Sequence, residues 1–447
     1  MLPKSYLTII LISILSGFLI FVSPALFFCF FLTSCLFYVI LKNTSSDDRV
    51  YILTITALAL ALRLTAVIIL QYNCTKRGVF DIFWDAQDNI TRGFTIADSL
   101  TGASSQKILV FGGYNTNGLT YFNGIFFALF GKDVIALKYI NFLCILAAAW
   151  LIYDLTVKIY SALAGRIAMA IILFWPTLFI WSLTDLKENH SVSAIAFMLW
   201  IADKVIFKKG LKKRLCFLLL LSIVSAYFVF LRLSFLQLLS FYFIILSLYN
   251  AFRWYIKKTL YKEIRIVVLL LFLGVILFLF KNRIFQIMAG AYGETIGRNM
   301  GFLSSGGFNY DLLGKEDNFY TIGFFMKFLF GSWFHFLLEP LPWHIFSFGL
   351  LINYSIVIIW YFLLFFSLAG IFKIRKHGHY DRAFSPLIFI ILAVTALSMS
   401  ISNIGTAIRL RDNITPIIAM FAACGMVNIL KIKEPDRAGR TIKAAIE

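Results

Sequence analysis

The sequence predicts an all-α, polytopic integral membrane protein with about 12 transmembrane helices. Of its 447 residues, 61% are hydrophobic and only 14% are charged, whereas a soluble domain carries about 25% charged residues. The mean hydropathy of +0.87 extends over the whole chain rather than one segment. We therefore expect the bilayer to be the solvent for most side chains, and we predict a single membrane-embedded domain over 1–447.

Apolar runs of about 17 to 25 residues mark the predicted spans, because that length crosses the hydrocarbon core as a helix. The runs are 5–22, 24–41, 50–71, 133–157, 164–183, 190–205, 215–231, 233–250, 266–281, 347–372, 384–402 and 413–430. The first has no small-residue cleavage site behind it and a second span follows at once, so we expect an uncleaved span.

Basic residues in the loops predict the orientation. They concentrate at 204–214, 253–265, 373–382 and 431–443, all of which fall on one side of a twelve-span chain. Short basic loops stay in the cytoplasm, so both termini are expected inside. Outer loops then cover 72–132 and 282–346, with short ones at 184–189 and 403–412. Because the net charge of +19 is explained by topology, no nucleic-acid partner is expected.

Three amphipathic segments of the two long outer loops are predicted to be surface helices. In the first loop, TRGFTIADSLTG has helical character, GGYNTNG is a turn-rich break, and LTYFNGIFFALFG is apolar and ends at Gly131. In the second, the stretch 317–346 is apolar enough to span, but a span there would move the basic loop at 373–382 outside. We therefore predict an interfacial or re-entrant helix that ends at Pro340 and Pro342, with Trp333 and Trp343 at headgroup level.

Carboxylates in the first outer loop are the leading candidates for chemistry. Asp81, Asp85 and Asp88 are spaced four and three apart, which places them on one face of a helix, beside Trp84. Such a carboxylate can accept a proton as general base, and a pair such as Asp85 and Asp88 can hold Mg²⁺ or Mn²⁺. The alternative is a solvated loop face.

A second acidic patch, SLTDLKENH, contains Asp185, Lys187, Glu188 and His190 in a short outer loop. Pairing it with the first loop would place carboxylates from two loops around one pocket. The alternative is a plain polar turn. The scattered histidines and cysteines show no metal-like spacing, so neither a zinc site nor a disulfide framework is expected.

Outer arginines are candidates for binding a phosphate, because guanidinium forks bind phosphate oxygens bidentately. Arg409 and Arg411 precede the last span, and Arg232 lies at the outer end of another. The alternative for the first two is pairing with Asp412 or lipid headgroups. Within the spans, Arg63 is expected to pair with a carboxylate or to line a substrate pathway, since intramembrane charges are costly.

Three features of residues 50–205 resemble the GT-C superfamily of polyprenyl-phosphate-dependent glycosyltransferases, which includes protein O-mannosyltransferases and the lipid A aminoarabinose transferase. Asp85 resembles the catalytic acid of the family's first loop. The phrases LFG, ALKYIN and GRIA resemble the passage into its next spans, and Pro176, Trp181, Ser182 and Glu188 resemble its third-span exit. Two extra spans would precede this core at 1–49, and further spans would follow at 206–447. There, EPLPW and NIGTAIRLRD resemble bacterial surface-polysaccharide proteins, including sugar-polymer polymerases.

The resemblance implies transfer of a sugar from a polyprenyl-phosphate carrier to a glycan, lipid or protein acceptor at the outer face. Asp85 would be the base, supported by Asp88 or Glu188. Arg409, Arg411 and Arg232 would hold the phosphate, with Asp81 and Trp84 in the substrate site. A lipid-linked oligosaccharide polymerase and, from another class, a lipid or polysaccharide transporter remain alternatives. The abundance of Lys, Ile, Phe and Asn favours a bacterial plasma membrane, although this topology would also serve the endoplasmic reticulum.

Overall fold

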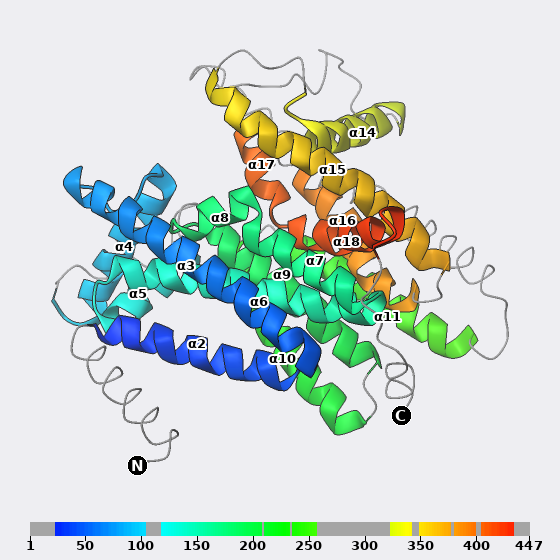
Figure 1. Ribbon diagram of the computed structural model, residues 1–447, viewed down its shortest axis with the longest axis horizontal. Coiled ribbons are helices and arrows are strands. Elements are labelled where there is room, and N and C mark those ends of the chain that lie inside the picture. The colour runs from blue at the N-terminus through cyan, green and yellow to red at the C-terminus, as the bar shows by residue number, and fades with distance from the viewer. Residues whose placement is uncertain are drawn as a thin grey trace. The chain divides into compact units, whose positions relative to one another are not determined.

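The computed structural model describes residues 23–103, 118–207, 210–232, 235–256, 322–341, 348–376, 380–398 and 404–432. All regular structure in these ranges is helical, without a strand (Figure 1). Within these ranges, seven helices are long and apolar enough to cross a membrane, or up to nine if each of two bent helix pairs is one span. The chain is therefore a multi-pass α-helical membrane protein. The expected spans 5–22 and 266–281, both termini and the GGYNTNG break lie outside the described residues, so the count of twelve stays a prediction.

Contacts between residues divide the chain into two compact units. Unit 1 comprises Met1–Val157, Ala162–Met198 and Ile223–Leu233, and unit 2 comprises Lys158–Ser161, Leu199–Ser222 and Ser234–Glu447. The single membrane-embedded domain remains a prediction, and each unit is described below by itself.

Unit 1 contains two helices of the first outer loop between two spans. The helices run in the order α2 (Pro24–Lys42), α3 (Ser46–Lys76), α4 (Trp84–Leu100), α5 (Gly118–Phe130), α6 (Val134–Ile159), α7 (Ala162–Phe174), α8 (Pro176–Ser182) and α9 (Lys187–Phe207), followed by the end of α10 (Leu211–Leu231). Most of the apolar stretch of α6 is buried, whereas α2, α3 and α10 expose apolar side chains. Such exposure fits lipid-facing positions.

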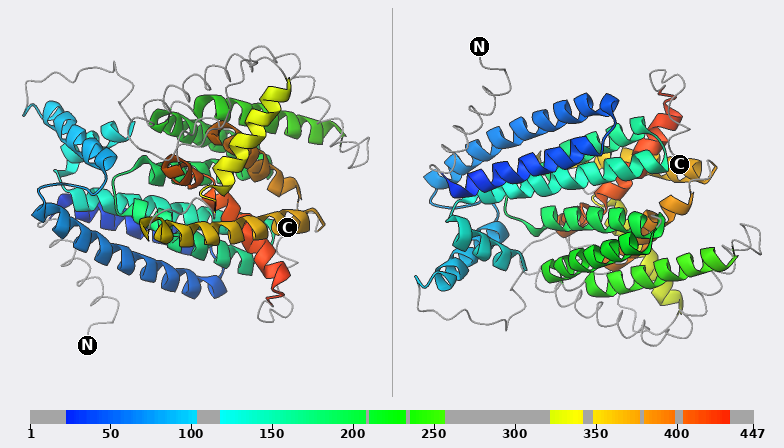
Figure 2. Two further views of the ribbon diagram at one scale, coloured as in Figure 1. Left: turned by 90° about the horizontal axis from the view of Figure 1, so that it is seen from above. Right: turned by 90° about the horizontal axis from the view of Figure 1, so that it is seen from below.

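The helices α4 and α5 pack on each other and confirm the two helices predicted in the first outer loop. They lie together beside one end of α3 and α6 (Figures 1 and 2). Gly93 and Gly124 permit this packing: a Cβ on Gly124 would meet Ile96, and one on Gly93 would lie 2.8 Å from the Cβ of Asn123. Ile90, Ala97, Phe127 and Leu137 join α4, α5 and α6 in one buried cluster. Because this cluster excludes water, it holds the loop helices in a defined position.

The opposite ends of the unit 1 helices meet in a separate polar cluster. Asp48 at the start of α3 accepts hydrogen bonds from Tyr153 Oη (2.8 Å) and Arg166 Nε (2.6 Å). These three residues lie near the helix ends that the loop charges predict to be on the cytoplasmic side.

Arg63 lies inside unit 1 without a carboxylate partner in the described part of the chain, so the expected pairing with an acid is wrong. Its Nε donates to Ser182 Oγ (2.8 Å) and its Nη2 donates to the carbonyl of Leu173 (2.7 Å). Its guanidinium also lies over the rings of Phe142 and Phe179. The last carbonyls of a helix lack intrahelical donors, and α7 ends just before Pro176. Arg63 therefore caps the break between α7 and α8, which are bent by 53°.

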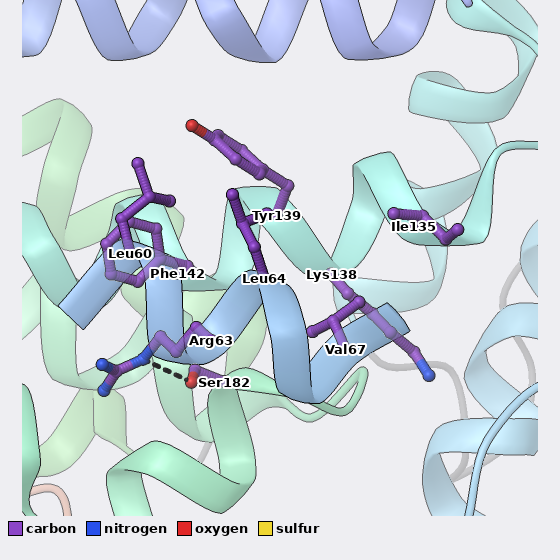
Figure 3. Close-up of a pocket in the computed structure, with 9 residues that line it drawn as sticks. All are labelled: Leu60, Arg63, Leu64, Val67, Ile135, Lys138, Tyr139, Phe142 and Ser182. Atoms are coloured by element: carbon purple, nitrogen blue, oxygen red, sulfur yellow. Dashed lines mark hydrogen bonds between the residues drawn. The ribbon is translucent and has the colours of Figure 1, made fainter. Parts of the chain in front are cut away.

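The aliphatic part of Arg63 borders a cleft between α3 and α6 (Figure 3). Leu60, Leu64 and Val67 line it from α3, and Tyr139 and Phe142 from α6. Arg63 and Lys138 also border this cleft, but their charged groups point in opposite directions.

Replacing Arg63 by methionine is expected to lower the melting temperature of the protein in detergent. The carbonyl of Leu173 would lose its donor, and an unsatisfied backbone group in an apolar environment costs about 2 kcal/mol or more. Arg92→Met is the control, because the half-exposed Arg92 bridges only Asp88 one turn away, where such pairs contribute about 0.5 kcal/mol. Equal melting temperatures for the two variants would contradict the capping role.

Unit 2 contains α11 (Phe235–Ile256), α14 (Ile322–Leu338), α15 (Phe348–Lys376), α16 (Tyr380–Ser398), α17 (Ile404–Arg411) and α18 (Thr415–Ile429). Helix α14 confirms the helix predicted before Pro340, although its depth in a membrane stays a prediction. Tyr242 and Tyr249 of α11 bond to Ser385 and Asp381 of α16, at 2.7 and 2.8 Å. α15 and α18 pack through Gly370 and Gly425, where a Cβ on either would meet the other helix's backbone.

Candidate functional site

Polar side chains from five helices and two loops meet at the outer-loop end of unit 1. They come from the α3–α4 loop (77–83), the α8–α9 turn (183–186), the first half of α4, the starts of α5, α6 and α9, and the end of α10. The buried members are Asp81, Asn89, Thr120, Asn123, Lys138, Asn141, Asp185, Glu188 and His190. Because buried polar groups are costly unless they are bonded, a cluster of this size beside apolar spans is the leading candidate for a functional site.

A fully buried ion pair joins the α3–α4 loop to α6. The Nζ of Lys138 lies 3.1 Å from Oδ2 of Asp81, and neither side chain is exposed. Lys138 also donates to Oε1 of Gln71 (3.1 Å) and to the carbonyl of Phe80 (3.3 Å). The other oxygen of Asp81 accepts the backbone N–H of Ile82 (2.7 Å). These bonds determine how the chain leaves α3 and enters α4.

The α8–α9 turn docks on this pair through Asp185. The backbone N–H of Asp185 donates to Oδ2 of Asp81 (3.2 Å), and its carbonyl accepts from Asn89 Nδ2 (3.3 Å). The Asp185 side chain lies 2.5 Å from Nδ2 of Asn123 on α5. The two acidic loops are therefore in direct contact, as a pocket formed from both loops would require. Burial raises the pKa of Asp185 to about 7, and the nearby charge of Asp81 contributes in the same direction.

Glu188 and Arg232 form a second buried ion pair, between the start of α9 and the end of α10. Nη2 of Arg232 lies 2.5 Å from Oε1 of Glu188, and Nε donates to Ser191 Oγ (3.3 Å). Two residues further along α9, His190 contacts Tyr227 Oη (2.6 Å) and Asn141 Oδ1 (3.0 Å) through its two ring nitrogens. Asn141 also donates to the carbonyl of Thr184 (2.8 Å), so α6, α9 and α10 are bonded together beside the Asp185 turn.

The first turn of α4 carries the predicted catalytic and substrate-binding residues at its surface. Asp85 is exposed in the first turn of α4. Trp84 begins the helix and is 84% exposed, which is unusual for an indole and fits contact with a lipid or a ligand. Asp88 is half-buried and its Oδ1 lies 2.9 Å from Nε of Arg92 on the next turn. The predicted common helix face is therefore wrong for Asp81, which is buried and paired in the loop before α4, whereas Asp85 is accessible on the helix.

Arg409 and Arg411 lie on α17 and belong to unit 2. Arg411 is buried and donates to the carbonyls of Phe336 and His335 in the last turn of α14. Trp360 Nε1 and Tyr361 Oη donate to the next two carbonyls of that turn, at 2.8 and 2.5 Å. Arg411 thus closes the C-terminal end of α14, a structural role that its sequence position did not suggest. Arg409 is half-buried.

The predicted metal ligands are Asp85 and Asp88. The described residues contain no group of three or more His, Cys, Asp or Glu side chains placed to hold a metal ion. Mg²⁺ is commonly held by one or two carboxylates together with waters and substrate phosphate, but Asp88 is already bonded to Arg92. We therefore derive no step through a metal.

Several residues of this site were absent from the sequence-based candidates. Asn89, Asn123, Asn141 and Tyr227 connect the acidic loops to α4, α5, α6 and α10. A recognisable signal exists for two of them, since Asn123 and Asn141 are amides inside otherwise apolar runs. Lys138 carries the same signal, a charge within the fourth predicted span.

We compared the sequence with protein-family models and with curated proteins. No family model matches the chain, and no curated protein matches it at a significant level.

Proposed function

We propose that this protein is a membrane glycosyltransferase of the GT-C type, which moves a sugar from a polyprenyl-phosphate carrier to an acceptor at the outer face of the membrane. The observation that carries the proposal is the arrangement of the two acidic loops. Asp81, Lys138 and Asp185 form a buried, bonded support, and the exposed Asp85 lies in the first turn of α4, four residues after Asp81. An accessible carboxylate on a fixed support at the end of apolar spans suits reaction with a membrane-bound substrate.

In this proposal Asp85 is the general base that accepts the proton of the acceptor hydroxyl. The bond between the anomeric carbon and the lipid phosphate breaks as the acceptor oxygen attacks, and the phosphate leaves with the electron pair. Positive charge that develops at the anomeric carbon is stabilised by nearby carboxylates. Asp88 supports Asp85 from the same face of α4.

The leaving phosphate needs a cationic ligand, and we propose Arg232 for that role. Arg232 belongs to the same unit as Asp85, where Glu188 and Ser191 position its guanidinium. Glu188 would therefore act by orienting Arg232. Trp84 would contact the sugar or the carrier lipid. A twelve-span chain with both termini in the cytoplasm of a bacterial cell would place the site at the outer surface.

The test is release of the free carrier lipid by the purified full-length protein in lipid vesicles. Polyprenyl-phosphate and polyprenyl-pyrophosphate sugars are supplied with an acceptor extract, and each experiment is repeated with added chelator to test for a divalent cation such as Mg²⁺ or Mn²⁺. Asp85→Ala is expected to reduce release by about 10²-fold to 10⁴-fold, the range for loss of a general base.

The matched control is Asp98→Ala, which removes another acid from α4, one that is half-exposed and paired with Lys132 at 2.6 Å. This variant should keep wild-type release. Full activity of Asp85→Ala would remove Asp85 from the role. Release from the pyrophosphate carrier with an oligosaccharide acceptor would instead identify a polymerase. Relocation of the lipid-linked sugar without release would identify a transporter.

A further inference from the structure

The side chain of Asp185 has an unsatisfied oxygen although it is completely buried. Its Oδ1 has no hydrogen-bond partner in the described structure, and neither has Oδ1 of the adjacent Asn123. Buried carboxylates are normally bonded at both oxygens. The amides of Asn123 and Asn141 and the charge of Lys138 favour the ionised form of Asp185, but they do not offset the burial of its carboxylate.

The charges around Asp185 are already balanced without it. The charged groups that act on Asp185 are Asp81 on the α3–α4 loop and Lys138 on α6, and α4, α5 and α6 contribute the amides of Asn89, Asn123 and Asn141. Lys138 is paired with Asp81, and Arg232 is paired with Glu188. An ionised Asp185 would consequently add a net negative charge to a site that is closed to water, which is strongly unfavourable.

The contact between Asp185 and Asn123 is short for its assigned atoms. Nδ2 of Asn123 lies 2.5 Å from Oδ2 of Asp185, whereas N–H···O bonds span about 2.7–3.2 Å and O–H···O bonds about 2.5–3.0 Å. The two ends of an amide are assigned from the hydrogen-bond network. If the Asn123 amide is turned over, a proton on Oδ2 of Asp185 donates to Oδ1 of Asn123 at an ordinary distance. The same change gives the Asn123 oxygen a partner.

We infer that Asp185 is a proton-binding site, occupied in slightly acidic solution, and that loss of its proton loosens the junction between the α8–α9 turn, α5 and the α3–α4 loop. The ionised carboxylate would repel Asp81, whose Oδ2 accepts the backbone N–H of Asp185. The hydrogen bond between Asp185 and Asn123 would also lose the proton that Asp185 donates. Because Asp81 determines the entry into α4, the proton state of Asp185 would influence the position of Asp85. This last consequence, but not the proton site itself, rests on the proposed function.

The proton site has a consequence for stability that does not depend on activity. The pKa of Asp185 is raised to about 7, above the value of about 3.9 in an unfolded chain. The folded state thus binds this proton more tightly, and the stability that the proton provides is complete below about pH 4 and is lost as the pH rises through about 7. Asp185→Asn carries a neutral side chain of nearly the same shape, so it should lack this pH-dependent component of the melting temperature.

The decisive experiment is infrared difference spectroscopy of the full-length protein in lipid vesicles, between about pH 5.5 and about pH 8.5. The wild type and the control Asp98→Asn should show a protonated-carboxyl stretch that disappears at the higher pH, and Asp185→Asn should lack it. The melting temperature of the wild type should fall over the same interval. A band retained in Asp185→Asn, or a wild type that shows neither the band nor the fall, would overturn the inference.

The carrier-release assay over the same pH range separates this inference from the proposed function. We expect release by the wild type to decline as the pH rises through about 7, and release by Asp185→Asn to lose that dependence. Absence of release at every pH, together with the expected infrared band, would contradict glycosyl transfer and leave the proton site in place. Normal release without an Asp185-dependent infrared band would support glycosyl transfer and contradict the proton site.

Discussion

Replacing Lys138 by methionine is expected to destabilise the protein by about 3–5 kcal/mol, the cost of breaking a buried ion pair by removing one partner. Lys138 and Asp81 are both completely buried, 3.1 Å apart. Without the lysine, the carboxylate of Asp81 would be left in a site closed to water, and Gln71 and the carbonyl of Phe80 would each lose a donor. The measurement is the melting temperature of the full-length protein in detergent, with the yield of monodisperse protein as a second measure.

A double-mutant cycle tests whether the pair itself is responsible. Asp81→Asn combined with Lys138→Met removes both charges, so the double variant should be more stable than Lys138→Met alone. Lys132→Met is the matched control, because Lys132 forms a half-exposed ion pair with Asp98, where we expect a loss below about 1 kcal/mol. A double variant whose loss equals the sum of the two single losses would show that the buried pair is not coupled.

Adding a methyl group to Gly370 is expected to destabilise unit 2 by about 1–3 kcal/mol, the range for overpacking a tight contact. A Cβ on Gly370 would meet the carbonyl oxygen of Phe421 and lie 2.9 Å from the backbone nitrogen of Gly425. Both atoms belong to the backbone of α18, so only a separation of α15 from α18 can relieve the clash. Small residues at such crossings are typical of membrane helices, because close backbone approach supplies the packing that association requires.

The control for Gly370→Ala is Gly331→Ala on α14, where an added Cβ has nothing within 4 Å. Alanine is favoured over glycine in a helix by about 1 kcal/mol, so Gly331→Ala should be neutral or stabilising. Melting temperatures of both variants in detergent make the comparison. A Gly370→Ala variant as stable as Gly331→Ala would show that the α15–α18 crossing is not tight.

Much of the helical layout was predictable because its signals are local. Apolar runs with charged or turn-forming ends predicted α3, α6 and α9, and the amphipathic stretches of the first outer loop predicted α4 and α5. The bend between α7 and α8 was hidden in one apolar run, 164–183, although Pro176 marks it. The ion pair between Asp88 and Arg92 could also be predicted from the sequence, since residues four apart share a helix face.

By itself, the sequence determined that this is a helical membrane protein, and it located the two acidic loops and the accessible Asp85. Only the tertiary structure decided which polar groups become partners. Asp81 is bonded to Lys138, 57 positions along the chain, Asp185 lies against Asn123, and Arg63 and Arg411 cap the ends of other helices. The physical reason is that helix formation depends on neighbours within a few turns, whereas the partner of a buried charge depends on which faces of distant helices pack together.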